Sequence, residues 1–292
     1  MLLMRLTIPL TFVGALLAAP VLSAQARPAQ AQPAQSQPDY ANAMRHEHAK
    51  DTPAPSPAAR IAPRAEVESQ TVVYGTVDGR QIKGFLTKPK GAKGGPAIIM
   101  VHEWWGLNDN IQAVAKRYAG EGYTVLAVDL FGRVATTPDS AMVLYQTAMK
   151  NVPGGEKNIA AAIGFLKAQG ATAIGAVGYC FGGHWSLRTG LVGGNDIKAV
   201  VMYYGAPITN PTEIARLKAP VLGLFGGKDT GIPVDSVRAM EKVMKAAGRT
   251  VAINVYADAN HAFANPTGQA YNAKAADDAW AKSLAFFRAQ LK

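Results

Sequence analysis

The alternation of short apolar runs with amphipathic segments is the feature that most constrains how this chain can fold. Runs such as 97–101, 173–178 and 221–225 recur between longer stretches with helical spacing. A continuous apolar run of this length is typical of a strand buried on both faces. Strands that alternate with helices predict an α/β fold, with a mainly parallel central sheet and helices on both of its faces.

One edge of this sheet is predicted to be antiparallel. Two β-rich runs, 71–77 and 81–86, flank Asp78-Gly79, and an Asp-Gly dipeptide in this position is typical of a hairpin turn. We therefore expect residues 66–292 to form one domain, without internal repeats, that begins with an edge hairpin. The other expected strands are 123–128, 199–204 and 251–256, and the expected helices are 110–120, 140–150, 156–169, 181–191, 234–247 and 273–291, with a Pro-Gly-Gly break at 153–155.

The first 26 residues are typical of a secretory signal peptide. Arg5 precedes an apolar run over 6–22, and Ala24-Gln25-Ala26 offers a small-residue cleavage site. The alternative is a membrane anchor, but the run is short for a full span and no basic stop-transfer cluster follows it. We expect cleavage, no stable membrane span afterwards, and a periplasmic or secreted protein.

Residues 27–65 are predicted to be a disordered linker. Of these 39 residues, 22 are Ala, Pro or Gln (11, 7 and 4), and few large apolar residues are present to offset the entropy of ordering them. His46-Glu47-His48 within this segment could weakly hold a metal ion, but an H-x-H pattern in a flexible tail rarely has a role. We assign it none.

The net charge of +10 does not indicate a nucleic-acid-binding protein. The basic residues are scattered, and no run of Lys and Arg interleaved with aromatic residues suggests a binding groove. The positive excess is more consistent with solubility or with attraction of small anionic substrates. We expect a monomer that acts on a small molecule.

The chain has one cysteine, Cys180, in a pattern that indicates a nucleophile. A predicted strand runs directly into Gly178-Tyr179-Cys180-Phe181-Gly182-Gly183, and a predicted helix follows. This is the G-x-nucleophile-x-G turn of α/β-hydrolases, with Cys in the usual place of Ser. The turn is so tight that a side chain two residues before or after the nucleophile would collide with the backbone, so both positions require glycine. The helix N-terminus favours the thiolate. The alternative is a buried cysteine that acts only as a small hydrophobe.

The general base is expected at His261. In α/β-hydrolases the chain order is nucleophile, acid, base. Only two histidines, His184 and His261, follow Cys180 in the sequence. His184 lies one turn into the predicted helix 181–191, where we expect its side chain to pack in the interior or to cap the helix. His261 lies in a loop after the predicted strand 251–256.

The acid is expected at Asp229. This residue ends a buried strand that enters a glycine turn, and it could fix the imidazole tautomer and stabilise its charged form. Asp258 is the second candidate. Asp196, in a Gly-Asn turn, and Asp235, at a helix start, fit the role less well.

Five segments together resemble the dienelactone hydrolases. They are V-H-E-W-W-G-L-N at 101–108, A-V-D-L-F-G at 127–132, G-Y-C-F-G-G at 178–183, F-G-G-K-D at 225–229 and A-N-H-A-F at 259–263. All five occur in the family order, and the likeness covers roughly residues 70–292. The resemblance implies the α/β-hydrolase fold.

The resemblance also implies roles that spacing alone does not reveal. A carboxylate at the position of Glu103 contacts the resting thiol in that family and helps to deprotonate it, although a glutamate here could instead cap a helix or pair with a surface arginine. The backbone N–H groups of Trp104 and Phe181 would form the oxyanion hole, each donor contributing roughly 3 kcal/mol. Residues expected near the substrate pocket are Trp104 itself, Trp105, Tyr179, Phe263 and Asn265.

One departure from the family concerns the substrate. Family members that act on chlorocatechol-derived lactones hold the substrate carboxylate with arginines, one of them four residues past the catalytic histidine. That position is Asn265 here, and residues 134–150 contain no arginine. The carboxylate clamp is therefore not carried over to this chain.

We thus expect a hydrolase that cleaves a lactone or carboxylic ester through an acyl-enzyme, without a metal or organic cofactor. One alternative is a broad-specificity exported carboxylesterase or thioesterase. A second is a non-catalytic binding protein on the same fold. A third is a surface-attached module whose linker binds a partner in the cell envelope.

Overall fold

The computed structural model of the protein describes residues 37–49 and 61–292. The predicted signal peptide, residues 1–26, lies outside the described residues, as does much of the predicted linker. Among the helices that are described, none combines the length and the apolar character needed to cross a bilayer.

An eight-stranded sheet forms the centre of the described domain, in the order β1-β2-β4-β3-β5-β6-β7-β8. The first two strands form an antiparallel hairpin, β2 pairs antiparallel with β4, and all later pairs are parallel. The expected antiparallel edge and parallel centre are confirmed. The strands are β1 (Val67–Val77), β2 (Arg80–Pro89), β3 (Gly95–Val101), β4 (Thr124–Val128), β5 (Ala171–Tyr179), β6 (Ile197–Tyr203), β7 (Val221–Gly226) and β8 (Val251–Tyr256).

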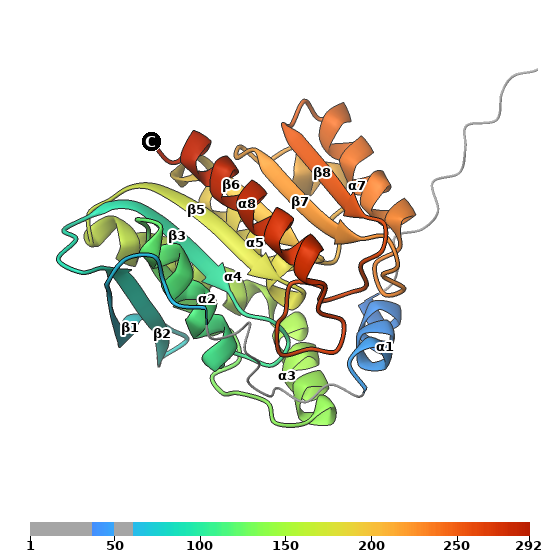
Figure 1. The fold of residues 1–292 in the computed structure, drawn as a ribbon, viewed down its shortest axis with the longest axis horizontal. Coiled ribbons are helices and arrows are strands. Elements are labelled where there is room, and N and C mark those ends of the chain that lie inside the picture. Colours follow the sequence, from blue (N-terminus) through green and yellow to red (C-terminus); the bar gives the residue numbers. More distant parts are fainter. Residues whose placement is uncertain (1–36, 50–60) are drawn as a thin grey trace, which may run out of the picture. The chain divides into compact units, whose positions relative to one another are not determined.

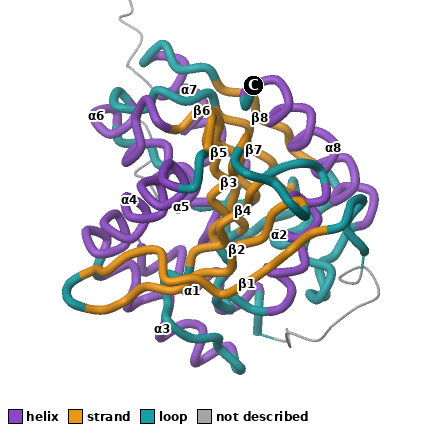
Figure 2. Tube along the Cα trace, turned by 90° about the vertical axis from the view of Figure 1, so that its left-hand side faces the viewer, coloured by secondary structure: helices purple, strands orange, loops and turns teal. Residues whose placement is uncertain are grey.

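Helices cover both faces of this sheet. On one face α2 and α8 pack together, since the Tyr118 ring lies 4.3 Å from that of Trp280 and 5.9 Å from that of Phe287. Helices α4 and α5 contact each other and lie on the other face, as Figures 1 and 2 show. The helices of the domain are α2 (Asp109–Gly120), α3 (Pro138–Lys150), α4 (Val152–Ala168), α5 (Phe181–Gly193), α6 (Pro211–Ile214), α7 (Val234–Ala246) and α8 (Ala273–Gln290), with a 3-10 turn at Gly194–Asp196.

The apolar runs of the sequence are the buried centre of the sheet. Every residue of β4 and of β7 is buried, as is 97–101 in β3. Because β3, β5, β6 and β7 are parallel neighbours, their carboxyl ends meet at one edge of the sheet. This edge is where open α/β sheets place their ligands.

The predicted break at 153–155 is absent, because α4 begins at Val152. Asn151 caps this helix, accepting a hydrogen bond from the Gly154 N–H, and Pro153 occupies the first turn, where a proline is tolerated. A Cβ on Gly155 would lie 2.2 Å from the Trp185 ring. The glycine therefore permits close packing of α4 on α5 and does not end a helix.

Residues 37–49 depart from the predicted disorder of the 27–65 segment. They include a helix, α1 (Gln37–Glu47), followed by a turn. Tyr40, Met44 and His48 lie four residues apart on one face and are 4%, 2% and 3% exposed. This face is buried against the rest of the domain, which supplies the stabilisation that the segment's own composition lacks.

Candidate active site

Cys180 occupies a strained turn between β5 and α5. Its φ of 55° lies in the left-handed region, which is unfavourable for a residue with a side chain. A Cβ on Gly178 would lie 1.8 Å from the carbonyl oxygen of Gly182, and one on Gly182 would lie 2.1 Å from that of Val101. The expected reason for the two glycines is therefore correct, and the turn sets the sulfur at the N-terminus of α5.

His261 connects this sulfur to a carboxylate. Its Nε2 lies 3.1 Å from Cys180 Sγ, and its Nδ1 lies 2.7 Å from Asp229 Oδ2. Asp229 follows β7. Its other oxygen, Oδ1, accepts a hydrogen bond from the Ile232 N–H at 2.8 Å, which holds the carboxylate in place. The distances are those that proton exchange between thiol and imidazole requires.

Burial and charge act in opposite directions on the two titrating groups. Burial would raise the pKa of the Cys180 thiol, but the charge and hydrogen bond of His261, with smaller effects of His48, lower that pKa to about 6. For His261, burial would lower the pKa, but Asp229 and the Cys180 sulfur raise it well above its ordinary value. The pair therefore favours a thiolate beside an imidazolium ion.

The other candidates for base and acid lie away from the sulfur. His184 contacts the Ala206 carbonyl at 3.0 Å and accepts from Arg188 at 3.1 Å, and burial followed by the Arg188 charge lowers its pKa to about 4. Asp258 is exposed and pairs with Lys228 at 3.0 Å.

Glu103 is buried beside the sulfur and held by two partners. The Asn265 amide donates to its Oε2 at 2.7 Å, and the Tyr204 hydroxyl donates to its Oε1 at 3.4 Å. Burial, reinforced by the Cys180 charge, raises the pKa of Glu103 to about 8. The alternatives of a helix cap or a surface ion pair for this residue do not fit, because its side chain faces the interior at 3% exposure.

His102 braces the loop that carries Glu103. It is fully buried, its Nε2 accepts from the Leu130 N–H at 3.1 Å, and burial lowers its pKa, so the ring is neutral. The ring also stacks on Phe181, with centroids 5.5 Å apart. This contact brings together the segments of Trp104 and Phe181, whose N–H groups are the expected oxyanion donors. His102 had no role predicted from the sequence, although a histidine directly after a buried strand is a signal of a residue near the site.

The residues expected to line a substrate pocket are nearly all buried. Trp105 is 1% exposed and packs edge-on to Trp104, and Phe263 has no exposed surface. Asn265 is engaged with Glu103, as described above. Trp105 packs against Trp104 and Phe263 against Tyr204, so both side chains lie in the packed interior and neither lines an open pocket.

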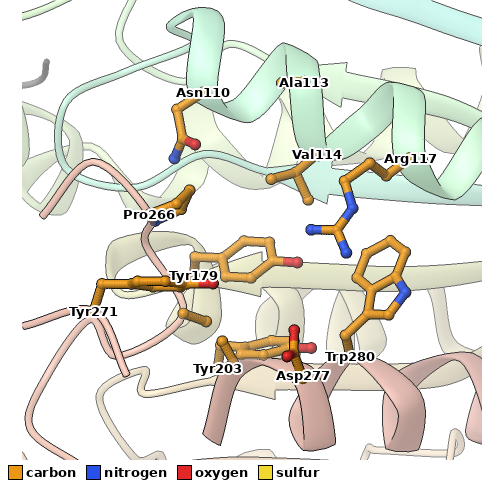
Figure 3. Close-up of a pocket in the computed structure, with 12 residues that line it drawn as sticks. Asn110, Ala113, Val114, Arg117, Tyr179, Tyr203, Pro266, Tyr271, Asp277 and Trp280 are labelled. Carbon is orange, nitrogen blue, oxygen red and sulfur yellow. The ribbon is translucent and has the colours of Figure 1, made fainter. Parts of the chain in front are cut away.

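Tyr179 borders a different cavity, shown in Figure 3, which lies between α2, the end of β5 and α8. Arg117 also lines this cavity, and its guanidinium lies 4.1 Å from the centre of the Trp280 ring. None of the lining residues is Cys180, Asp229 or His261. This cavity is therefore separate from the sulfur.

Helix α1 places side chains directly on the sulfur and on the rings around it. Met44 Sδ lies 3.8 Å from Cys180 Sγ. The His48 ring stacks on Trp104 with centroids 4.5 Å apart and approaches His261 edge-on at 5.4 Å. Cys180 is only 2% exposed, so a substrate reaches the sulfur only when these side chains move aside.

The involvement of Met44 and His48 was missed by sequence reasoning. The signal was present as Tyr40, Met44 and His48 at intervals of four residues, which is the spacing of one helical face. His48, the second histidine of the H-x-H pattern for which no role was expected, is the residue that reaches the site.

Comparison with known proteins identifies relatives of this arrangement. The sequence profile of the dienelactone hydrolase family matches residues 82–291. A protein from Methylorubrum extorquens named as a carboxymethylenebutenolidase is 35% identical over 218 residues, which cover 68% of this chain and 74% of the relative. One of the same name from Escherichia coli is 30% identical over 258 residues, covering 81% and 93%.

The fold has solved counterparts as well. A crystal structure described as that of a dienelactone hydrolase from Klebsiella pneumoniae superimposes with a TM-score of 0.69 and 27% identity. The match covers 76% of this chain and 99% of the other.

Proposed function

Because the chain belongs to the dienelactone hydrolase family and is a hydrolase of that kind, we propose that it cleaves a lactone or carboxylic ester with Cys180 as the nucleophile. The observation that carries the proposal is the position of His261, whose two ring nitrogens lie 3.1 Å from the sulfur and 2.7 Å from Asp229. A buried carboxylate behind such a ring fixes its tautomer and stabilises its charged form.

The reaction follows from the positions of these groups. The Cys180 thiolate adds to the substrate carbonyl, and the N–H groups of Trp104 and Phe181 stabilise the oxyanion. His261 gives its proton to the departing alkoxide, which leaves an acyl group on the sulfur. His261 then takes a proton from water, the hydroxide attacks the thioester, and the carboxylic acid is released as the thiolate forms again.

Glu103 is proposed to receive the thiol proton when the sulfur is protonated. Burial and the Cys180 charge raise the pKa of Glu103 to about 8, so its ionised carboxylate is a stronger base than that of an ordinary glutamate. Asn265 and Tyr204 hold this carboxyl group in place.

A broad carboxylesterase is the second candidate, and Asn265 favours it. This side chain donates to Glu103 instead of presenting a cation to the substrate. An anionic lactone would then have no partner for its carboxylate at this position. We therefore expect uncharged esters and lactones to be hydrolysed at least as well as anionic ones.

The test is a panel of lactones and p-nitrophenyl esters, assayed with the wild type, Cys180→Ser and Cys180→Ala. We expect Cys180→Ala to lose at least about 10³-fold in kcat/KM, because the covalent step has no nucleophile. Mass spectrometry of the wild type mixed with a p-nitrophenyl ester should show an acyl adduct on Cys180. Full activity of Cys180→Ala would contradict the proposal and favour another nucleophile, whereas a wild type that hydrolyses no member of the panel would favour a binding protein.

A further inference from the structure

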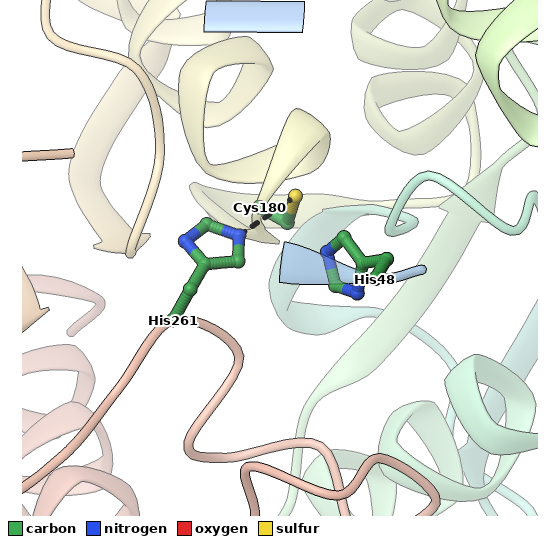
Figure 4. Close-up of side chains that lie close together, drawn as sticks. All are labelled: His48, Cys180 and His261. Atoms are coloured by element: carbon green, nitrogen blue, oxygen red, sulfur yellow. Dashed lines mark hydrogen bonds between the residues drawn. The ribbon is translucent and has the colours of Figure 1, made fainter. Parts of the chain in front are cut away.

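Three buried side chains at the sulfur form a group with the composition of a metal site. The ligand atoms of His48, Cys180 and His261 all lie within 4.8 Å of one another. Figure 4 shows the His48 ring on the other side of Cys180 from His261. Tetrahedral sites with bonds of 2.0–2.3 Å hold their ligand atoms about 3.5 Å apart, so a shift of about an ångström would complete the geometry.

A fourth soft donor lies at the same place. Met44 Sδ is 3.8 Å from the Cys180 sulfur, and Met44 lies four residues before His48, which is in the turn that follows α1. A thiolate, two imidazoles and a thioether form a soft ligand set that selects zinc or copper over magnesium or calcium. Two His and one Cys with a distant Met is also the set found in copper proteins.

The surroundings of these ligands match what metal sites need. The Nε2 of His261 faces the Cys180 sulfur at 3.1 Å, and its Nδ1 lies 2.7 Å from Asp229 Oδ2. A carboxylate on the far nitrogen is the usual second partner of a metal-binding histidine, because it fixes the ring and its tautomer. The ring of His48 is held by stacking on Trp104 at 4.5 Å.

Helix α1 is anchored in the position that the site requires. Arg45 forms an ion pair with Asp139 at 2.7 Å, and the Thr230 hydroxyl donates to Glu47. Met44 and His48 lie outside residues 82–291, the region that matches the family profile. The composite site therefore needs two residues that the matched region does not contain.

We propose that His48, Cys180 and His261, with Met44 as a weak fourth donor, bind a thiophilic transition-metal ion of the Zn²⁺ or Cu⁺ kind. The bound ion occupies both the sulfur and the Nε2 of His261 and holds α1 over them. Metal and ester therefore compete, and the metal-bound protein is an inactive, closed form. The inhibitory part rests on the proposed function, whereas metal binding does not.

The test is anaerobic titration of the full chain with Co²⁺, which gives a thiolate-to-metal absorption band when a cysteine binds it. We expect one Co²⁺ per chain in the wild type. His48→Ala should bind at least about tenfold more weakly, since loss of even an outer partner of a metal ligand costs 10- to 100-fold. His46→Ala is the matched control, because His46 lies two residues before His48, at the end of α1, and is exposed. It should bind like the wild type.

Competition then identifies the ion. Zn²⁺ and Cu⁺ should displace Co²⁺, whereas Mg²⁺ and Ca²⁺ should not, because hard cations prefer oxygen ligands. If Cu⁺ is the preferred ion, Met44→Leu weakens its binding more than that of Zn²⁺. Displacement of Co²⁺ by Mg²⁺ would overturn the proposal.

Two further outcomes separate this inference from the proposed function. If His48→Ala binds Co²⁺ as tightly as the wild type while remaining folded by circular dichroism, the composite site does not exist, whatever the esterase assays give. If Co²⁺ binds through His48 but metal-free protein hydrolyses no ester, the site stands and the proposed function fails.

Discussion

Cys180 and His261 are close enough to share a proton, and this contact determines how the reaction should respond to pH. The pKa of Cys180 is lowered to about 6, so the thiolate predominates above that pH and is lost below it. We expect kcat/KM for a neutral ester to fall as pH decreases through about 6.

Iodoacetamide alkylation of Cys180 should have the same midpoint, because it also needs the thiolate. In His261→Ala the midpoint should move upward, since the charge and hydrogen bond of His261 lower the thiol pKa. A wild-type alkylation midpoint near 9.0, the ordinary thiol value, would contradict the ion-pair interpretation.

Asn265 is expected to stabilise the fold through its hydrogen bonds to Glu103, Asn110 and Thr267. Its amide donates to the buried Glu103 carboxylate at 2.7 Å, and its Oδ1 accepts from Asn110 and Thr267, so Asn265→Ala leaves these groups without this partner. We expect the free energy of unfolding to fall by about 1–3 kcal/mol in urea denaturation. Asn260→Ala, an exposed asparagine of the same loop, should change it by less than about 0.5 kcal/mol. Equal effects of the two variants would mean that the buried hydrogen bonds of Asn265 contribute nothing to stability.

At the scale of an element, the turn between β5 and α5 depends on glycines because backbone segments approach each other too closely there for a side chain. A Cβ on Gly178 would lie 1.8 Å from the Gly182 carbonyl oxygen, and backbone there has little freedom to move. We expect Gly178→Ala to destabilise the protein by at least about 1–3 kcal/mol, as overpacking does.

Gly164 in α4 is the matched control for that variant. A Cβ there would meet nothing within 4 Å, so Gly164→Ala should stabilise the helix by about 0.5–1 kcal/mol. Thermal unfolding of both variants would decide the matter. A Gly178→Ala protein as stable as the wild type would show that the turn at Cys180 can accommodate a side chain at position 178.

Helix α1 should limit access to the nucleophile. Tyr40 is buried in the domain, with its ring 5.9 Å from that of Tyr145. Tyr40→Ala removes this anchor, so we expect α1 to leave the sulfur more often and iodoacetamide to alkylate Cys180 faster. Asn42→Ala, at an exposed position of α1, is the control. Mass spectrometry of the modified protein gives both rates, and equal rates would mean that α1 does not cover the sulfur.

The elements differed in how far the sequence could predict them. The strands were predictable because β3, β4 and β7 are apolar along their length. The turn at Cys180 was predictable because the strand, the glycines and the cysteine are contiguous in the sequence. Helix α1 was not, since its order depends on contacts with residues more than ninety positions away, such as Arg45 with Asp139. The composition of a segment describes only that segment, so it cannot reveal contacts with residues that are distant in the sequence.

At the scale of the whole molecule, the active-site wall combines two parts of the chain with different sequence character. The profile match over 82–291 includes Cys180, Asp229 and His261, whereas Met44 and His48 come from a segment rich in Ala, Pro and Gln. Asn265 was predictable as a departure from the family, but its bond to Glu103 was not, because the two residues are 162 positions apart.

At the same scale, we propose that the protein is exported and that signal peptidase removes residues 1–26. The apolar run over 6–22 and the Ala24-Gln25-Ala26 sequence have the form that this enzyme recognises. Cleavage after Ala26 leaves ten residues before α1, so processing spares the helix that reaches the sulfur. We expect intact-mass spectrometry of protein from the periplasm or medium to show a chain that begins at Arg27. Replacement of Ala24 and Ala26 by bulky residues should block this cleavage, because the peptidase accepts only small side chains there. A full-length chain recovered from the membrane fraction in the wild type would instead favour an anchor.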